Sequence, residues 1–311
     1  MLSRTADQLY WMARYIERAE NMARILDVSE RMALMPEGPN ELASIWGSAV
    51  QIAGGASDFT ARYGAPQRQN VIRFLALDPD NSSSIYSCLR AARENARALR
   101  TAITTEMWES LNSTWLDIRD IDEIKLAARG DFFGWVKERS YLLRGVTEGT
   151  MLQDDAIRFL DLGWYLERAD NTARLLDGKY HVLLPNVDAV GGAVDYYQWG
   201  AVLRSVSAFR AYHQIYSDTI SPARVAELLV LRPDMPRSLH ACFNRITARL
   251  DELCGEQPYE CKRVGGELHA KLHYGRMAEI FQQGLHEFLK DFVDRSLAFG
   301  IQMQRDFLMI S

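Results

Sequence analysis

One segment of thirteen residues occurs twice in the chain, and this duplication constrains the fold more than any other feature. Residues 15–27 and 165–177 are identical at nine of thirteen positions, and three of the other four exchange similar side chains. The first copy reads Tyr-Ile-Glu-Arg-Ala-Glu-Asn-Met-Ala-Arg-Ile-Leu-Asp, and the second reads Tyr-Leu-Glu-Arg-Ala-Asp-Asn-Thr-Ala-Arg-Leu-Leu-Asp. A polar set of one Glu, one Asn and two Arg is therefore shared by two segments that differ elsewhere.

The duplication extends beyond this segment. Weaker matches follow in the same order in both halves, and the spacing between matching residues grows from 150 to 156. The matching segments are 46–47 and 199–200, 74–80 and 228–234, and 138–140 and 294–296. This period is too long for a solenoid repeat. It predicts two helical repeats, roughly 1–150 and 151–311, related by an internal pseudo-twofold axis. Because no Ser/Gly-rich linker separates them, we expect a single domain over 1–311.

The pattern of apolar residues predicts an all-α protein, a bundle of many helices. Pro and Gly, which number 9 and 20, cluster at breaks, and between the breaks apolar residues recur at three and four. The first helix is expected over roughly 4–34. In each repeat we expect a long motif helix, a Trp-Gly helix, a third helix and a closing helix. Asp80 and Asp234 are candidate N-caps of the third helices.

Composition narrows the choice of partners and compartment. The net charge of −5 gives no basic excess for nucleic acid. No apolar run approaches the about 20 residues of a membrane span, and the N-terminus has no signal-peptide core. The four cysteines form no Cys-x-x-Cys pair, which is typical of small buried hydrophobic residues in a reducing compartment. We expect a cytoplasmic protein without nucleic-acid or membrane partners.

The repeated polar residues lie along one edge of their helices. At 100° per residue, Glu17, Asn21 and Arg24 fall within about 60° of each other, opposite the apolar stripe. Asn is a mediocre residue inside a helix, so its recurrence indicates a satisfied polar network. Three interpretations remain open, namely an inter-helix network, a ligand or catalytic cleft, and a solvated face. The candidate residues are Glu17, Arg18, Asn21 and Arg24, with Glu167, Arg168, Asn171 and Arg174.

A related run lies on the third helix of the first half only. Arg93, Glu94, Asn95 and Arg97 carry the same residue types, whereas the corresponding stretch 245–249 lacks Glu and Asn. If the protein has one working site, these four residues would be the contribution of the first half. The alternative is a charged, solvated helix face.

Other chemical motifs are weak or missing. His269 and His273 are spaced i,i+4, which suits two metal ligands on one helix face, but Ala-Lys-Leu between them lacks the Glu of a metalloprotease helix. No Glu-x-x-His pair, glycine-rich phosphate loop or Gly-x-Ser-x-Gly turn occurs. The sequence therefore predicts neither a metal site nor a cofactor.

The chain resembles the alpha-E family, an all-helical bacterial family, over essentially its whole length. The resemblance rests on motifs at residues 2–21, 77–79, 92–97 and 165–174. It implies an association with a circularly permuted ATP-grasp protein and, as a second partner, a transglutaminase-like protease. The recurrent Glu of the family falls on Glu17 and Glu167.

The resemblance implies a part in ATP-dependent peptide or amide-bond formation. In this hypothesis the chain is an accessory or catalytic component, whose arginines bind a carboxylate or phosphate. Glu17 or Glu167 would orient an amine or act as a general base. The alternative is a non-catalytic helical scaffold that binds other proteins. An independent enzyme is a third hypothesis.

Overall fold

The computed structural model describes residues 2–34, 39–128, 130–182 and 193–308. Every regular element in these ranges is helical, which confirms the predicted all-α class. The first half contains α1 (Ser3–Met32), α2 (Pro39–Ile52), α3 (Ala56–Tyr63), α4 (Arg68–Ile72), the π-helical turn η1 (Arg73–Leu77), α5 (Ile85–Ala98), α6 (Thr105–Ile118), α7 (Glu123–Ala128) and α8 (Phe132–Thr150).

The second half begins with the other long helix. It contains α9 (Asp155–Val182), α10 (Ala193–Ser205), α11 (Phe209–Tyr216), α12 (Pro222–Val230), α13 (Leu239–Cys254), α14 (Glu260–His273), α15 (Met277–Gln283), α16 (Leu285–Met303) and the π-helical turn η3 (Gln304–Leu308). The helix expected over roughly 4–34 is thus confirmed as α1. The four helices expected in each half are too few, because short helices fill the connections.

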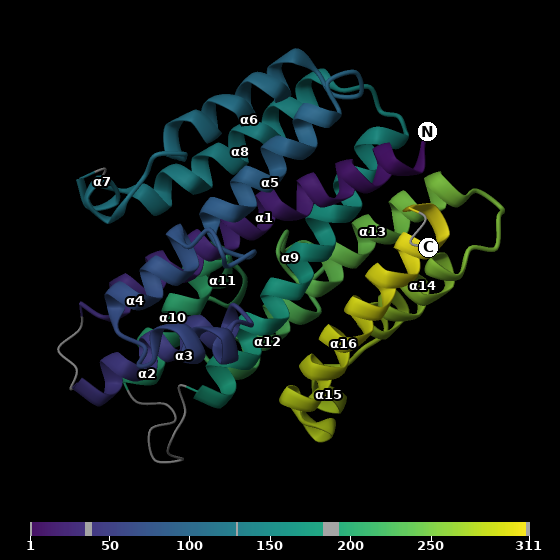
Figure 1. The fold of residues 1–311 in the computed structure, drawn as a ribbon. Coiled ribbons are helices and arrows are strands. Elements are labelled where there is room, and N and C mark those ends of the chain that lie inside the picture. The colour runs from purple at the N-terminus through teal and green to yellow at the C-terminus, as the bar shows by residue number, and fades with distance from the viewer. Residues whose placement is uncertain (1, 35–38, 129, 183–192, 309–311) are drawn as a thin grey trace.

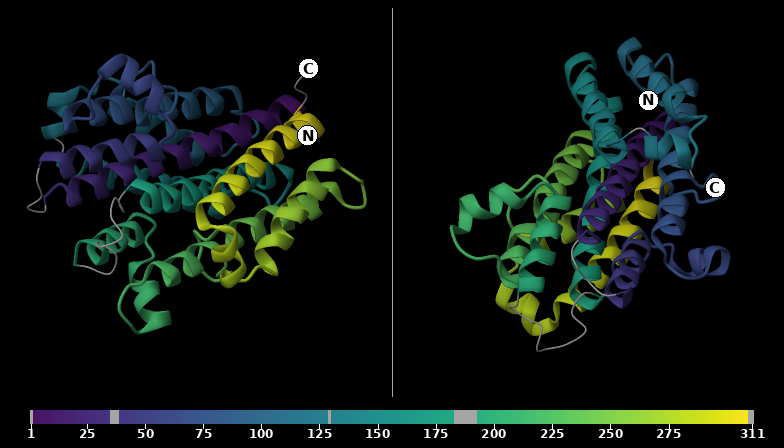
Figure 2. Two further views of the ribbon diagram at one scale, coloured as in Figure 1. Left: turned by 90° about the horizontal axis from the view of Figure 1, so that it is seen from below. Right: turned by 90° about the vertical axis from the view of Figure 1, so that its left-hand side faces the viewer.

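The two motif helices form the centre of the molecule. α1 packs directly against α9, and other helices enclose the pair (Figure 1). α5 and α8 cover α1, with α6 packed between them, whereas α13 and α16 cover α9, with α14 packed between them. α2 reaches across to α9, and α10 reaches across to α1. Figure 2 shows these groups of helices from two further sides.

The central position of α1 changes the meaning of its polar edge. The apolar stripe is buried as predicted, but Glu17, Glu20 and Asn21 on the opposite edge are at most 1% exposed. A helix covered on all sides has no solvated face, so its charged groups must find partners within the protein. The interpretation of the ladder as a plain surface is therefore wrong for α1.

Serines, not the predicted aspartates, cap the third helices. The Ser84 hydroxyl accepts a hydrogen bond from the Ser87 amide at the start of α5, and Ser238 caps α13 in the same way. Asp80 lies in the preceding turn, where its amide donates to the Asp78 side chain, and Asp234 pairs with Arg232. The N-cap assignment was wrong because the chain makes one more turn after each Pro-Asp pair.

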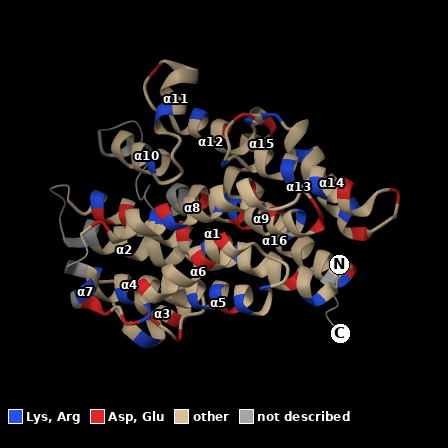
Figure 3. Ribbon diagram, turned by 90° about the horizontal axis from the view of Figure 1, so that it is seen from above, with Lys and Arg blue, Asp and Glu red and all other residues tan. Residues whose placement is uncertain are grey.

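Charged residues occur on helices of both halves, and some of them are buried. Figure 3 shows Lys and Arg interspersed with Asp and Glu over the helices, including the central α1 and α9. Across the described residues, no helix combines the length and apolar composition that a membrane crossing requires. All four cysteines are buried and free, as predicted, and burial raises the pKa of Cys88 to about 12.

Candidate functional site

The repeated Glu-Arg dipeptides of the two motif helices pair with each other. Arg18 on α1 donates from Nε to Glu167 Oε1 at 2.6 Å and from Nη2 to Glu167 Oε2 at 3.0 Å. In return, Arg168 on α9 donates to both carboxylate oxygens of Glu17 at 3.2 and 3.1 Å. Both contacts are bidentate, the strongest geometry for an Arg–carboxylate pair. These reciprocal bridges join α1 to α9.

Around Glu17 the turn before α13 adds a buried arginine. Arg237 Nη1 donates to Glu17 Oε1 at 3.1 Å and to Asn21 Oδ1 at 3.2 Å, and its Nη2 contacts Glu20. Arg237 is 5% exposed and directly precedes Ser238, the N-cap of α13. Burial lowers its pKa to about 9, partly offset by Glu20, so the guanidinium remains charged at neutral pH.

The α8 helix closes the other side of this cluster. Arg144 contacts Glu17 and also donates to Glu20 at 3.3 Å, and the Ser140 hydroxyl donates to Glu20 at 2.6 Å. Arg24 Nε adds a bond of 2.9 Å to Glu20. Burial by itself would raise the pKa of Glu20, but Arg237 and Arg24 outweigh it and lower that pKa.

Arg24 also satisfies its remaining donors within the protein. Its Nη1 donates to the Ser205 carbonyl at 2.9 Å and to the Ser207 hydroxyl at 3.0 Å, and its Nη2 donates to the Tyr141 hydroxyl. Each charged member of this cluster has a protein partner, although Arg144 Nε has none among the described residues, and the cluster is sealed from solvent except at Arg144. We call them the closed network: Glu17, Glu20, Arg24, Arg144, Arg168 and Arg237.

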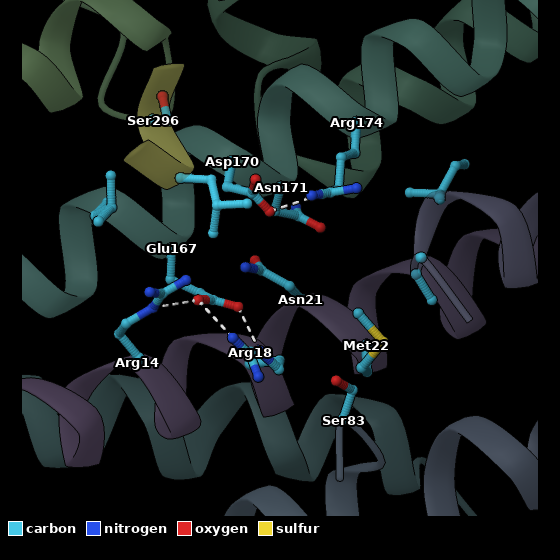
Figure 4. A pocket seen from close by; sticks show the side chains of 15 residues that line it. Arg14, Arg18, Asn21, Met22, Ser83, Glu167, Asp170, Asn171, Arg174 and Ser296 are labelled. Atoms are coloured by element: carbon cyan, nitrogen blue, oxygen red, sulfur yellow. Dashed lines mark hydrogen bonds and ion pairs between the residues drawn. The ribbon is translucent and has the colours of Figure 1, made fainter. Parts of the chain in front are cut away.

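A pocket of about 270 Å³ opens on the other side of the α1–α9 contact. We call it the open pocket (Figure 4). α1 and α9 supply its charged walls, the end of α2 and Ser83 close one side, and Ser296 and Leu297 of α16 contribute to the rim. Its polar lining consists of Arg14, Arg18, Asn21, Ser83, Glu167, Asp170, Asn171, Arg174 and Ser296.

Glu167 is the anionic centre of this pocket and is fully engaged. Arg14 Nε donates to its Oε2 at 2.7 Å, in addition to the bidentate contact from Arg18. Arg14 is itself oriented by the Tyr10 hydroxyl, which accepts from its Nη1 at 3.0 Å. Burial opposes ionisation of Glu167, but Arg18 and Arg14 outweigh it and lower its pKa to about 2.

Two donors at the pocket are less completely paired. Arg174 Nε donates to Asp170 at 2.8 Å, and its side chain is 39% exposed. Asn21 points from α1 across the gap toward Asn171 on α9 (Figure 4). The bond from Arg237 fixes Asn21 Oδ1 as the acceptor, and within the described part of the chain its buried Nδ2 has no hydrogen-bond partner.

The predicted site residues divide between these two regions. The open pocket is lined by Arg18, Asn21, Glu167, Asn171 and Arg174. Glu17, Arg24 and Arg168 belong instead to the closed network, and Asn21 touches both regions. The interpretation as a network therefore describes one side of the α1–α9 contact, and the interpretation as a cleft describes the other.

The predicted run on α5 lies apart from both regions. Arg93 contacts Asn112 of α6 at 3.3 Å and lies over the Trp108 ring, while Glu94 and Arg97 are 51% and 66% exposed. Neither these residues nor Asn95 lines the open pocket. The structure thus does not bring this run together with the motif helices, and a binding role for it stays a prediction.

Sequence reasoning missed the partners that come from outside the motif. Ser140 and Arg144 lie on α8, and Arg237 lies just before α13. All three are far from the repeated segment in the sequence. Arg14 was also missed, although it lies only one turn before Arg18. The acidic residue at the position of Glu20 and Asp170 could have been recognised from the sequence, because it is acidic in both copies and pairs with the Arg four residues later.

Comparison of the sequence with known proteins identifies a family. Residues 1–308 match the Alpha-E family, described as a predicted alpha-helical domain with a conserved ER motif. The Glu-Arg dipeptides that cross-pair α1 and α9 are two such Glu-Arg sequences.

Uncharacterized proteins of Mycobacterium bovis and Mycobacterium tuberculosis are 24% identical to the chain over 314 aligned positions, which include 93% of this chain. The chain spans about a third, 34%, of the length of these relatives. No solved structure matches it significantly. The match over residues 1–308 shows that the chain belongs to the Alpha-E family.

Proposed function

We propose that the open pocket binds a small molecule through its carboxylate or phosphate group. The observation that carries this proposal is the buried Asn21 Nδ2, a donor on a pocket-lining residue that has no hydrogen-bond partner among the described residues. A buried donor left unpaired costs about 1–3 kcal/mol, which a ligand oxygen would recover. Arg174, at the same pocket, commits only Nε to Asp170 among the described residues, so its terminal nitrogens supply further donors.

The charge of the pocket agrees with such a ligand. Three arginines, Arg14, Arg18 and Arg174, face two carboxylates, those of Glu167 and Asp170, which leaves a net positive charge. Guanidinium groups recognise carboxylates and phosphates by two parallel hydrogen bonds. In this arrangement Glu167 orients Arg14 and Arg18, and Arg174 with Asn21 contacts the ligand.

A role as general base suits neither motif glutamate. The pKa of Glu167, about 2, makes its carboxylate a weak base at neutral pH, and both oxygens are engaged by Arg18 and Arg14. Glu17 is 0% exposed and paired with Arg168 and Arg237, so a ligand in the open pocket does not reach it. We therefore propose that both glutamates position arginines.

We also propose that the two halves are repeats of one helical unit. The mutual packing of α1 and α9, the matching coverage of each by two later helices, and the serine caps of α5 and α13 support this. In that scheme the open pocket and the closed network are counterparts. Ser83 and Arg237 then occupy corresponding positions, each directly before its N-cap serine.

At the level of the cell, we propose that the chain serves an ATP-grasp-linked system that forms peptide or amide bonds. Its pocket would hold the carboxylate or acyl-phosphate group of a substrate or intermediate. This proposal is supported by the resemblance of the chain to the alpha-E family and by a pocket suited to a carboxylate or phosphate group. A non-catalytic scaffold is the second candidate, favoured by the sealed closed network, which has the character of a structural joint.

Calorimetric titration of the full chain tests the ligand proposal. Probes are inorganic phosphate, acetyl phosphate and a set of amino and dicarboxylic acids. Arg174→Gln should weaken binding about tenfold or more, because a charged hydrogen bond is worth about 1.5–3 kcal/mol. The matched control is Arg97→Gln on the exposed side of α5, which should bind as the unmodified chain does. Equal binding by both variants, or binding of none of the probes, contradicts the proposal.

The system-level proposal needs a separate experiment. The chain is mixed with a circularly permuted ATP-grasp protein, ATP and candidate amino acids, and amide formation and complex formation are measured. Loss of amide formation in Arg174→Gln, with the complex intact, supports a substrate-binding component. Unchanged product with the Glu17→Gln, Glu167→Gln double variant would exclude a catalytic role for either glutamate. Absence of any complex contradicts the partnership but leaves the ligand test unaffected.

A further inference from the structure

Three histidines converge at the surface between α13 and α14, away from both regions described above. His240 lies in the first turn of α13, and His269 and His273 lie one turn apart on α14. Their ring centroids are 5.3–5.8 Å apart. One ring nitrogen from each lies within 4.8 Å of the others. The i,i+4 pair of the sequence therefore acquires a third member from a neighbouring helix.

His240 has a buried lone pair without a partner. Its Nδ1 lies 2.8 Å from the Leu231 carbonyl oxygen, which only accepts, so Nδ1 carries the proton. In the neutral imidazole Nε2 then carries the lone pair, and this nitrogen is buried without a hydrogen-bond partner among the described residues. The residue is 5% exposed. A buried acceptor with no donor is costly unless another group, such as a metal ion, occupies its lone pair.

His269 is oriented in a complementary way. Its Nε2 lies 2.6 Å from Asn244 Oδ1, an amide oxygen that only accepts, so Nε2 donates and Nδ1 presents its lone pair. Metal-binding histidines commonly donate their second ring nitrogen to an oxygen in this manner, which fixes the tautomer and the ring orientation. His240 and His269 therefore both have the hydrogen bonds expected of histidines that bind a metal ion.

We propose that His240, His269 and His273 bind a divalent transition-metal ion of the Zn²⁺ class. Three imidazole nitrogens at about 2.0–2.1 Å, with water in the fourth position, form a common tetrahedral zinc geometry. His273 is exposed, so its ring is free to approach the other two, and solvent reaches the open position. The positive charge of Lys271, on the same helix, is directed to Asp291 at 2.7 Å. The ion would tie α13 to α14. This proposal does not depend on the open pocket.

Metal titration of the whole chain, without a histidine tag and after removal of metals by chelation, tests the proposal. Zn²⁺ binding is followed by calorimetry, and Co²⁺ binding by its visible absorption. We expect one tightly bound ion per chain and the intense spectrum of four-coordinate cobalt. A weak spectrum like that of hydrated cobalt, or no saturable Zn²⁺ binding, would overturn the proposal.

Variants separate this site from general metal adsorption. His273→Gln changes an exposed residue, so the chain should fold, and it should weaken Zn²⁺ binding by at least about 100-fold. Asn244→Ala should weaken it about 10- to 100-fold through loss of the outer hydrogen bond. The control, His286→Gln, alters a histidine paired with Asp177 at 2.6 Å and should leave binding unchanged. Equal Zn²⁺ affinity of His273→Gln and the control would contradict the site.

Discussion

The closed network and the open pocket lie on opposite sides of one helix contact and share most of their chemistry. Each contains a Glu-Arg bridge, an acidic residue paired with the Arg one turn later, and an Asn between them. They differ in three residues that fill the closed network, Arg237, Tyr141 and Arg144. In the proposed repeat, the spacings of 154 (237 − 83) and 156 (297 − 141, 300 − 144) residues place Ser83, Leu297 and Gly300 at the corresponding positions. Small or apolar residues thus leave a space where longer polar ones complete a structural joint.

The Gly at position 300 shows how the pocket side accommodates a different arginine. A Cβ built there would lie 3.3 Å from Leu166, 3.4 Å from the Tyr10 hydroxyl and 3.9 Å from Arg14. The contact with Leu166 is tight and would require that side chain to shift slightly, whereas the contact with the Tyr10 hydroxyl is at the limit of ordinary van der Waals distance. Glu167 receives its second arginine, Arg14, from α1, whereas Glu17 receives Arg144 from α8.

The largest expected effect is the loss of Arg237. Arg237→Ala removes a buried partner of Glu17 and Glu20 and should lower the free energy of unfolding by about 3–5 kcal/mol. The measurement is denaturation by urea. Ser83→Ala, at the matched place before the other N-cap, should change stability by less than about 0.5 kcal/mol. Equal losses in the two variants would show that the two regions do not differ as described.

The pH dependence of stability tests the Glu167 bridge. Because its pKa in the folded chain is about 2, below the ordinary 4.5, its ionised form stabilises the fold fully above pH 4.5. That contribution, about 3 kcal/mol, is lost as the pH falls from 4.5 toward 2. Urea denaturation between about pH 6 and pH 3 should show a steeper decline for the unmodified chain than for Glu167→Gln. Parallel curves would mean that the bridge is absent in solution.

A smaller effect is expected where the closed network reaches its outer edge. Tyr141→Phe removes the hydroxyl that accepts from Arg24 Nη2 and should cost about 1.5–3 kcal/mol, the usual value for a bond to a charged group. Leu297→Met, the matched change at the pocket, keeps volume and polarity and should cost under about 1.5 kcal/mol. Thermal unfolding of both variants provides the comparison, and a larger loss for Leu297→Met would reverse it.

The smallest effect is expected on α5. Arg97→Gln alters a residue that is 66% exposed and pairs with Glu94 at 3.6 Å. Exposed pairs of this kind contribute about 0–1 kcal/mol, so unfolding should shift by less than that. A large loss of stability or of ligand binding would instead indicate that residues 93–97 belong to the functional site.

Much of the fold could be predicted from the sequence, because helical periodicity is a local property. α1 begins and ends within two residues of its predicted boundaries. Asn21 takes part in a polar network through its Oδ1, but its Nδ2 has no partner among the described residues, so the network is not fully satisfied as predicted. Local sequence patterns do not show that a helix is buried on every side. The edge of α1 opposite its apolar stripe is covered by α9 and by Arg237, which is more than two hundred residues away.

The candidate site was only half accessible to sequence reasoning for the same reason. The repeated residues were found because they recur, but their recurrence says nothing about which side is filled. That outcome depends on Ser83, Leu297 and Gly300, which are ordinary residues in the sequence and acquire meaning only beside Arg237, Tyr141 and Arg144. The N-caps were misplaced because an Asp after Pro suits a turn as well as a helix start.

The most direct test of the account is a crystal structure of the chain with the tightest-binding anion from the titration panel. We predict an anion in the open pocket, within hydrogen-bond distance of Asn21 Nδ2 and Arg174. We also predict that crystals of the Ser83→Arg variant, grown with the same anion, will show the introduced guanidinium at the position of the anion. An anion against the closed network instead, or an open pocket that stays without one while the anion occupies another surface, would contradict the central claim.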